Sequence, residues 1–196
     1  MLGATWVLWL LVLLSVVGFA VILERAYFFV MSREDWPRFR ADLAKAFESK
    51  DWKAARERAN ASKSPEARII AAGLEAPETG AASVEERMAS ETQAVKLGLE
   101  RNLAFLGTVG NNAPFVGLLG TVIGVLRAFH SLDKSGGQIS SGLMAEVGEA
   151  LVATAIGILV ALPAVAFFNF FQRAIRVRVS RAESLGRLLL ASLKSE

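Results

Sequence analysis

Residues 103–129 read LAFLGTVGNNAPFVGLLGTVIGVLRAF, and this stretch decides the fold class of the chain. Its one charged side chain is Arg127, close to the end, and glycine recurs every few positions. About 20 apolar residues are enough for a helix to cross the roughly 30 Å hydrocarbon core of a bilayer. Glycine lets the backbones of membrane helices approach closely. The stretch therefore predicts a spanning helix packed on another helix. The alternative, a buried hairpin of a soluble protein, would require helices that are apolar on every side.

Two further apolar runs predict two further spans. Residues 1–30 are apolar from about Thr5 to Leu23 and end in Glu24-Arg25 and an aromatic group typical of a membrane interface. Residues 147–171 are rich in alanine. A cleaved signal peptide is the alternative for the first run, but no Lys or Arg precedes it and no small-residue cleavage site follows it. We expect three retained transmembrane helices in an all-α membrane protein.

The composition narrows the chemistry of the chain. Of its 196 residues, 53% are hydrophobic and 21% charged, and the net charge of +3 is too small to indicate nucleic-acid binding. The chain has no cysteine and one histidine, His130, so disulfides and the usual thiolate or histidine metal sites are not expected. It also lacks the phosphate-loop and nucleophile-elbow motifs. We expect no enzyme activity, no cofactor and no metal.

Basic residues predict the orientation. None precedes the first run, fourteen lie from Arg25 to Arg101, and six lie from Arg173 onward. The positive-inside rule places residues 31–102 and 172–196 in the cytoplasm. The N-terminus and the loop 130–146 are then periplasmic.

The cytoplasmic segments are expected to be helical. Asp35-Trp36-Pro37 and Ser64-Pro65-Glu66 predict helix starts, and Ser83 with Glu86 predicts a capping box. We expect the helix from Ser83 to continue into the second span. The third span should continue through residues 172–196, which carry an apolar stripe at Leu185, Leu188, Leu189 and Leu193. A structural bundle that supports oligomerisation is favoured over a docking surface.

Two threonines lie at one predicted depth in the membrane. Thr121 is about eight residues from the outer end of its span and Thr154 about seven, so both lie roughly 10–12 Å below the outer boundary. Each shares a helix face with small residues, namely Pro114 and Gly117 for Thr121 and Ala150, Gly157 and Ala161 for Thr154. Either hydroxyl alone could bond back to its own helix. Two at one level indicate a polar layer that lines a path or clasps another helix.

Two other residues of the spans need partners. Pro114 removes a backbone hydrogen bond and should bend its helix, with Asn111 placed to satisfy freed groups. Glu149 lies one turn inside the third span, where a carboxylate costs about 1–3 kcal/mol unless it is hydrated, paired or protonated. It points about 140° away from Thr154 around the helix. Glu149 therefore belongs in a vestibule, between subunits, or in water at the membrane surface.

The residues of the second and third spans resemble a known family. The run from Asn112 to Gly124, NAPFVGLLGTVIG, is similar to the APFxGLxGTVxG signature of the ExbB/TolQ/MotA proton-channel family. GEALVATAIG from Gly148 to Gly157, followed by ALPA from Ala161, resembles the family motif AEALxATAxGLxxAxPA. The Glu24-Arg25 pair is similar to the family's ending of the first span. Three spans and an outward N-terminus resemble the ExbB and TolQ type more than four-span MotA.

The resemblance implies the assembly and the working residues. It implies a ring-shaped homo-pentamer in the bacterial inner membrane around a single-span ExbD/TolR-type partner whose helix carries a proton-binding Asp. A TonB/TolA-type protein and membrane lipids are further expected partners. Thr121, Thr154 and Glu149 match family positions on the proton pathway, and the small residues that match the motifs would pack helices and line the pore (Pro114, Gly117, Gly120, Gly124, Ala150, Gly157 and Ala161).

The expected function is that of a proton-driven stator subunit. The partner would supply the mid-membrane carboxylate that this chain lacks, and the proton motive force would drive work at the envelope, as in TonB-dependent uptake or the Tol-Pal system. A gliding-motility stator, a sodium-driven variant and a non-conducting membrane scaffold are alternatives. Replacement of either threonine by valine separates a motor, which should stall, from a scaffold, which should not.

Overall fold

The computed structural model describes residues 5–134 and 141–194, and these residues form helices with no strand among them. Three helices are long and apolar enough to cross a membrane: α1 (Thr5–Met31), α6 (Leu103–Lys134) and α7 (Ser141–Lys194). Shorter helices lie between α1 and α6: α2 (Trp36–Glu48), α3 (Trp52–Asn60), α4 (Pro65–Gly73), the 3-10 turn η1 (Pro77–Thr79) and α5 (Ala81–Glu100). The predicted all-α class with three spans is confirmed.

The chain forms two compact units, and both α1 and α7 contribute to each. Unit 1 consists of residues up to Glu24 and Asn102–Phe170, and unit 2 consists of Arg25–Arg101 and the residues from Phe171. The first apolar run therefore changes unit at the Glu24-Arg25 pair. The third changes unit two residues before the first arginine of the C-terminal segment, Arg173.

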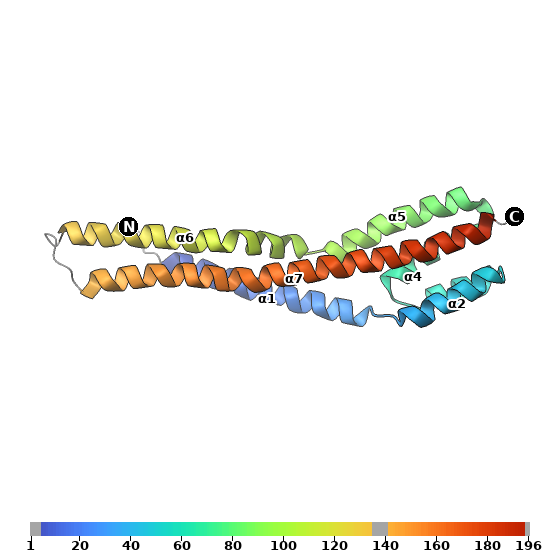
Figure 1. Ribbon diagram of the computed structural model, residues 1–196, viewed down its shortest axis with the longest axis horizontal. Helices are drawn as coiled ribbons and strands as arrows, with labels where there is room; N and C mark the ends of the chain where they lie inside the picture. The colour runs from blue at the N-terminus through green and yellow to red at the C-terminus, as the bar shows by residue number, and fades with distance from the viewer. Residues whose placement is uncertain (1–4, 135–140, 195–196) are drawn as a thin grey trace. The chain divides into compact units, whose positions relative to one another are not determined.

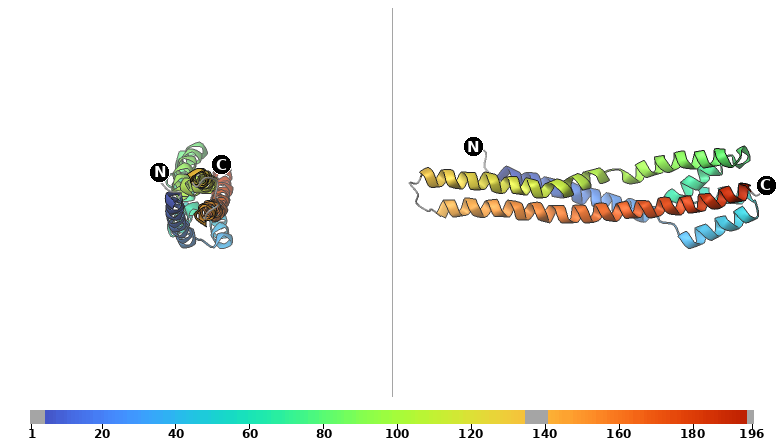
Figure 2. Two further views of the ribbon diagram at one scale, coloured as in Figure 1. Left: turned by 90° about the vertical axis from the view of Figure 1, so that its left-hand side faces the viewer. Right: turned by 45° about the horizontal axis from the view of Figure 1, so that its top comes forward.

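Unit 1 packs three helices with small contact residues. Figures 1 and 2 show α6 running alongside the first part of α7. Its buried cluster draws on all three helices and comprises Val7, Leu11, Val109, Ala113, Val160, Ala161 and Ala164. Large apolar side chains cover the outside, and Trp9 and Leu159 are 70% and 69% exposed. An apolar exterior of this kind suits lipid, and the chain is a multi-pass membrane protein.

Unit 2 packs amphipathic helices around large side chains. On α2, Phe39, Leu43 and Phe47 recur every four residues and are buried. The predicted helix starts at Asp35 and Ser64 are confirmed, because each side chain accepts a hydrogen bond from the backbone N–H three residues later. Figures 1 and 2 show α5 alongside the last part of α7.

Two predictions about α5 are wrong. The helix begins at Ala81, after Gly80 with a φ of 91°, so Ser83 lies inside it and caps nothing. The helix also ends at Glu100 instead of continuing into the second span. Asn102 adopts a left-handed φ of 63°, a conformation that asparagine tolerates better than most residues and that a helix cannot contain.

The third span continues as a single helix to Lys194, as predicted. Leu185 and Leu189 of the predicted apolar stripe are fully buried, whereas Leu188 is 39% exposed. The expected loop 130–146 overlaps the helices, because α6 runs to Lys134 and α7 begins at Ser141. Its residues 135–140 lie outside the described residues.

Candidate functional site: the seam between α6 and α7

Glycine and alanine form the contact between α6 and α7. A Cβ atom on Gly117 would lie 2.7 Å from the carbonyl oxygen of Ala153 and 2.9 Å from the Cα of Thr154. A Cβ atom on Gly157 would lie 2.7 Å from the carbonyl oxygen of Ala113. The helices therefore meet backbone to backbone at this level, which only residues without a side chain permit.

The same seam extends in both directions along the antiparallel pair. A Cβ atom on Gly110 would strike Val165, and one on Gly124 would lie 2.5 Å from the Cβ of Ala150. Gly120 lies against Ala153 and also against Val7 of α1. The residues predicted for helix packing therefore make packing contacts or are buried within this chain (Gly117, Gly120, Gly124, Ala150, Gly157 and Ala161). Their pore-lining role stays a prediction.

Pro114 lies within α6 and is half-buried. The nearby amide that bonds to the helix is not Asn111, as expected, but Asn112, whose Nδ2 donates to the carbonyl of Thr108 at 2.8 Å.

The two threonines lie at one level of the seam, but their hydroxyls differ. Gly120, next to Thr121, contacts Ala153, which is next to Thr154. The hydroxyl of Thr121 donates to the carbonyl of Leu118 at 2.7 Å, which is bonding to its own helix. The Oγ1 atom of Thr154 is buried and has no hydrogen-bond partner among the described residues. A buried hydroxyl without a partner is rare in folded proteins, and this one distinguishes Thr154 from Thr121.

Two glutamates tie the first turns of α7 to the other helices of unit 1. Glu149 is half-buried, and its Oε1 accepts a hydrogen bond from the Thr5 hydroxyl of α1 at 3.1 Å. Glu146 accepts a bond from Ser131 at 3.2 Å and forms an ion pair with Arg127 at 3.7 Å. Glu149 therefore contacts α1 through an exposed hydrogen bond of unit 1.

Sequence reasoning missed the Arg127–Glu146 pair. The signal lay in the register of the seam, because Arg127 follows Gly124 by three residues and Glu146 precedes Ala150 by four. Because the helices are antiparallel, placing Gly124 opposite Ala150 brings the side chains of Arg127 and Glu146 together. The register itself is not visible in either helix alone.

Sequence reasoning also missed two arginines in unit 2. Arg178, 9% exposed, donates to the Ser32 hydroxyl at 2.7 Å and to the Phe29 carbonyl at 2.8 Å, and its guanidinium lies 4.9 Å from the centre of the Phe29 ring. Arg25 donates to the Gly98 carbonyl near the end of α5 and stacks on Phe28. Each arginine thus binds the negative C-terminal end of another helix.

Glu66 and Arg178 influence each other electrostatically. Burial raises the pKa of Glu66, and its own backbone N–H and the positive charges of Arg178 and Arg181 oppose that rise. Burial lowers the pKa of Arg178, and the Glu66 carboxylate opposes that change. The two groups are therefore buried charges that partly compensate each other.

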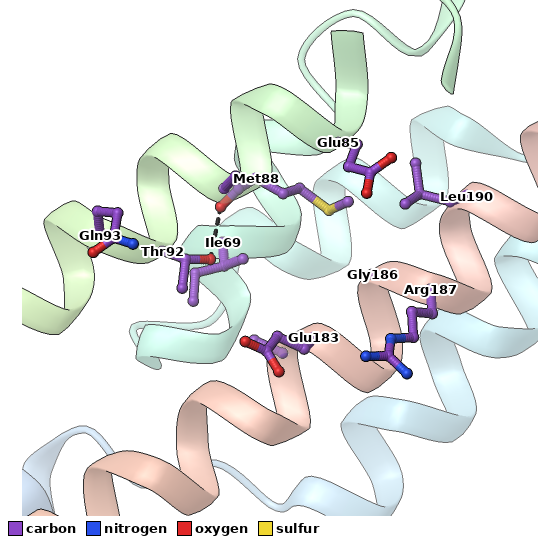
Figure 3. A pocket seen from close by; sticks show the side chains of 11 residues that line it. Ile69, Glu85, Met88, Thr92, Gln93, Glu183, Gly186, Arg187 and Leu190 are labelled. Atoms are coloured by element: carbon purple, nitrogen blue, oxygen red, sulfur yellow. Dashed lines mark hydrogen bonds between the residues drawn. The ribbon is translucent and has the colours of Figure 1, made fainter. Parts of the chain in front are cut away.

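A groove between α5 and α7 marks a further packing joint in unit 2. Figure 3 shows Met88 directed between the two helices, with Glu85, Glu183 and Arg187 around it. The groove has a volume of about 310 Å³, and Ile69 and Ala182 contribute to its apolar lining. Met88 fills the space left by Gly73 and Gly186, whose absent Cβ atoms would lie 2.8 Å and 3.2 Å from it. Within residues 5–134 and 141–194, no group of three acidic, histidine or cysteine side chains could hold a metal ion.

Comparison with known proteins identifies similar chains. The model of the MotA/TolQ/ExbB proton channel family matches residues 61–184. The ExbB-like 2 biopolymer transport protein of Helicobacter pylori is 35% identical over 92 residues, which are 47% of this chain and 61% of that protein. The biopolymer transport protein ExbB of Xanthomonas campestris is 48% identical over 75 residues, 38% of this chain and 30% of that protein. ExbB of Aquifex aeolicus is 38% identical over 87 residues, 44% and 59% of the two chains. The chain thus spans less than two thirds of each of these relatives.

Proposed function

The chain belongs to the MotA/TolQ/ExbB proton channel family, and from this membership we propose that it is the stator subunit of a proton-driven motor. In this role it forms part of a pathway through the membrane and converts the proton motive force into mechanical work at the cell envelope. The work is that of TonB-dependent uptake or of a Tol-Pal type system. We propose no enzymatic turnover.

The observation that carries the proposal is the free hydroxyl of Thr154. Its Oγ1 atom is buried in the α6–α7 seam opposite Gly117 and has no partner among the described residues. In a scaffold, a buried hydroxyl without a partner costs free energy and returns nothing. In a proton pathway, the same hydroxyl has a use. It can donate a hydrogen bond to a carboxyl group or a water molecule from outside the chain, or accept one from it.

The proton-binding group must come from a second protein. The acidic residues of the three apolar runs lie near their ends, at Glu24, Glu146 and Glu149, and the interior of each run has none. We propose a single-span partner of the ExbD/TolR type that brings an Asp to the level of Thr154. Several copies of this chain, expected to be five, would surround it.

The proposed location is the bacterial inner membrane. The fourteen basic residues of Arg25–Arg101 and the six from Arg173 onward lie in unit 2. The positive-inside rule places unit 2 in the cytoplasm, and the first residues of the chain in the periplasm.

A threonine-to-valine substitution tests the function. Thr154→Val keeps the shape of the side chain and removes the hydroxyl, and Thr154→Ser is the matched control that keeps it. Proton uptake is measured with a pH-sensitive dye in vesicles containing the complex recovered from its own membranes. We expect the valine variant to assemble and to lose flux on the order of tenfold, the equivalent of one hydrogen bond of about 1.4 kcal/mol.

Native mass spectrometry of the same preparations gives the composition of the complex. A ring with a small single-span protein supports the proposal. Unchanged flux in the valine variant, or a homo-oligomer that never contains a partner, would replace the motor with a scaffold.

A further inference from the structure

We propose that Arg173, Arg176 and Ser180 of α7 form a binding surface for the phosphate group of an anionic phospholipid. This inference concerns unit 2 alone. It rests on the proposed orientation, which places this part of α7 at the cytoplasmic leaflet, the leaflet whose anionic lipids attract basic segments.

The three side chains share one face of the helix. They are spaced by three and four residues, which places them one above another along an α-helix. All three are exposed, and with Val177 and Arg181 they line an open hollow of about 600 Å³. Two guanidinium groups and a hydroxyl supply the fixed donors that recognise phosphate oxygens.

The charges of this surface are uncompensated, unlike those of several other arginines in unit 2. Arg58 pairs with Glu34 and Asp42, Arg68 pairs with Glu91, and Arg87 pairs with Glu75. Arg178 and Arg181 face the field of Glu66. Within the described parts of the chain, Arg173 and Arg176 form no ion pair.

The surroundings favour a lipid over an acidic protein segment. Arg173 is the first charged residue after the apolar run 147–171, which is the level at which lipid phosphates lie. Val177, 43% exposed, also lines the hollow and offers an apolar contact that a fatty acyl ester uses and a carboxylate-rich peptide does not. The guanidinium of Arg181 lies 5.4 Å from the centre of the Trp36 ring, and tryptophan is enriched at membrane interfaces.

Lipid retention tests the surface. The purified full chain is incubated in mixed micelles with equal amounts of phosphatidylglycerol and phosphatidylcholine, and the lipids that it retains are counted by native mass spectrometry. The test variant is the double substitution Arg173→Gln with Arg176→Gln. The control is Arg40→Gln with Arg56→Gln, which removes the same charge from two exposed arginines of unit 2.

We expect the wild type and the control to prefer phosphatidylglycerol and the test variant to lose this preference. Each arginine near an anionic surface contributes a factor of about five in binding, so the two together should contribute on the order of tenfold or more. Equal losses in test and control variants would overturn the proposal, because the preference would then follow total charge. A second double variant, Arg173→Lys with Arg176→Lys, serves in case the glutamine variant does not fold. It keeps both positive charges and should retain most of the preference for phosphatidylglycerol.

Competitors identify the source of the anion. Inorganic phosphate that displaces phosphatidylglycerol at equal concentration would indicate a site for free phosphate, and an acidic peptide that does so would indicate a protein partner. Either result overturns the lipid assignment. The measurement needs neither a partner nor a proton gradient, so its outcome is independent of the test of motor function.

Discussion

Unit 1 and unit 2 bring helices together by opposite means. At the centre of the contact between α6 and α7 in unit 1, backbone meets backbone, with Gly117 against Ala153 and Gly157 against Ala113. Where α5 meets α7 in unit 2, the thioether of Met88 fills the space beside Gly73 and Gly186. The cores differ in the same way, because unit 2 buries Phe39, Leu43 and Phe47 and unit 1 buries mainly alanine and valine.

The difference follows from the solvent around each unit. In lipid, burying a leucine between helices gains little, because the hydrocarbon outside is equally apolar, and close backbone contact supplies the attraction. In water, burying large apolar side chains is the main driving force. A seam glycine such as Gly117 therefore cannot be replaced without moving a backbone. Gly73 and Gly186 of unit 2 instead adjoin a flexible side chain, Met88, which can move aside.

Replacing one contact glycine of each unit by alanine should give the largest difference between the units. For Gly117→Ala we expect a loss of about 3 kcal/mol in the free energy of unfolding, because the new methyl group meets a backbone oxygen that cannot move aside. For Gly186→Ala the nearest atoms are the Sδ and Cε of Met88, at 3.2 and 3.3 Å, which can rotate away. The expected change is within about 1 kcal/mol, since alanine also favours the helix.

Gly148→Ala is the control in unit 1. No atom lies within 4 Å of the position its Cβ would take, so the substitution should be neutral or stabilising. The three variants are compared by thermal unfolding in one detergent. A loss for Gly186→Ala as large as that for Gly117→Ala would contradict the distinction between the units.

Arginine at the helix ends gives the second comparison. We expect Arg178→Gln to lower the free energy of unfolding by about 2 kcal/mol, because the Phe29 carbonyl and the Ser32 hydroxyl lose a charged donor in a buried place. The substitution also removes the positive charge that opposes the burial cost of Glu66. Arg187→Gln, at an exposed position on the same helix, should change stability by less than about 0.5 kcal/mol. Similar losses in both would mean that net charge, not the cap, stabilises unit 2.

The comparison of the units also explains what the sequence could predict. Spans and helix starts depend on local signals, and the apolar runs and the caps at Asp35 and Ser64 were sufficient to place them. The contact of Arg178 with Ser32 joins residues 146 positions apart, and no local pattern announces it. The same holds for Arg127 and Glu146, whose meeting depends on the register of two helices.

The α5 errors arose where two local signals competed. Ser83 with Glu86 has the spacing of a capping box, but Gly80 three residues earlier accepts the positive φ that ends the preceding turn, and the helix starts there. At Asn102 neither glycine nor proline marks the break. The one signal in the sequence was the asparagine itself, because asparagine tolerates a left-handed conformation, and this signal is weak.

The last comparison lies within unit 2, between two carboxyl groups whose pKa values move in opposite directions. Burial raises the pKa of Glu66 above 4.5. Burial also acts to raise the pKa of Glu34, but hydrogen bonds from Arg58 and Ser62 outweigh it and bring the pKa below 4.5. Between the pKa of Glu66 in the unfolded state and its higher pKa in the folded state, the folded protein binds more protons than the unfolded protein. Its stability therefore falls as the pH rises through this window. Glu34 does the reverse, and its contribution is lost as the pH falls through its folded pKa.

Replacing Glu66 or Glu34 by glutamine should therefore change the pH dependence of the unfolding free energy in opposite directions. Glu66→Gln removes the fall above pH 4.5, so its unfolding free energy should gain on the wild type as the pH rises towards neutrality. Glu34→Gln removes the stabilisation present above pH 4.5, so it should lose most at neutral pH and least in acid. Chemical unfolding from pH 4 to pH 8 measures both profiles. Parallel profiles for the two variants would show that the surroundings of Glu66 stabilise its charge as those of Glu34 do. The buried carboxyl of Glu66 would then not be a cost that Arg178 offsets.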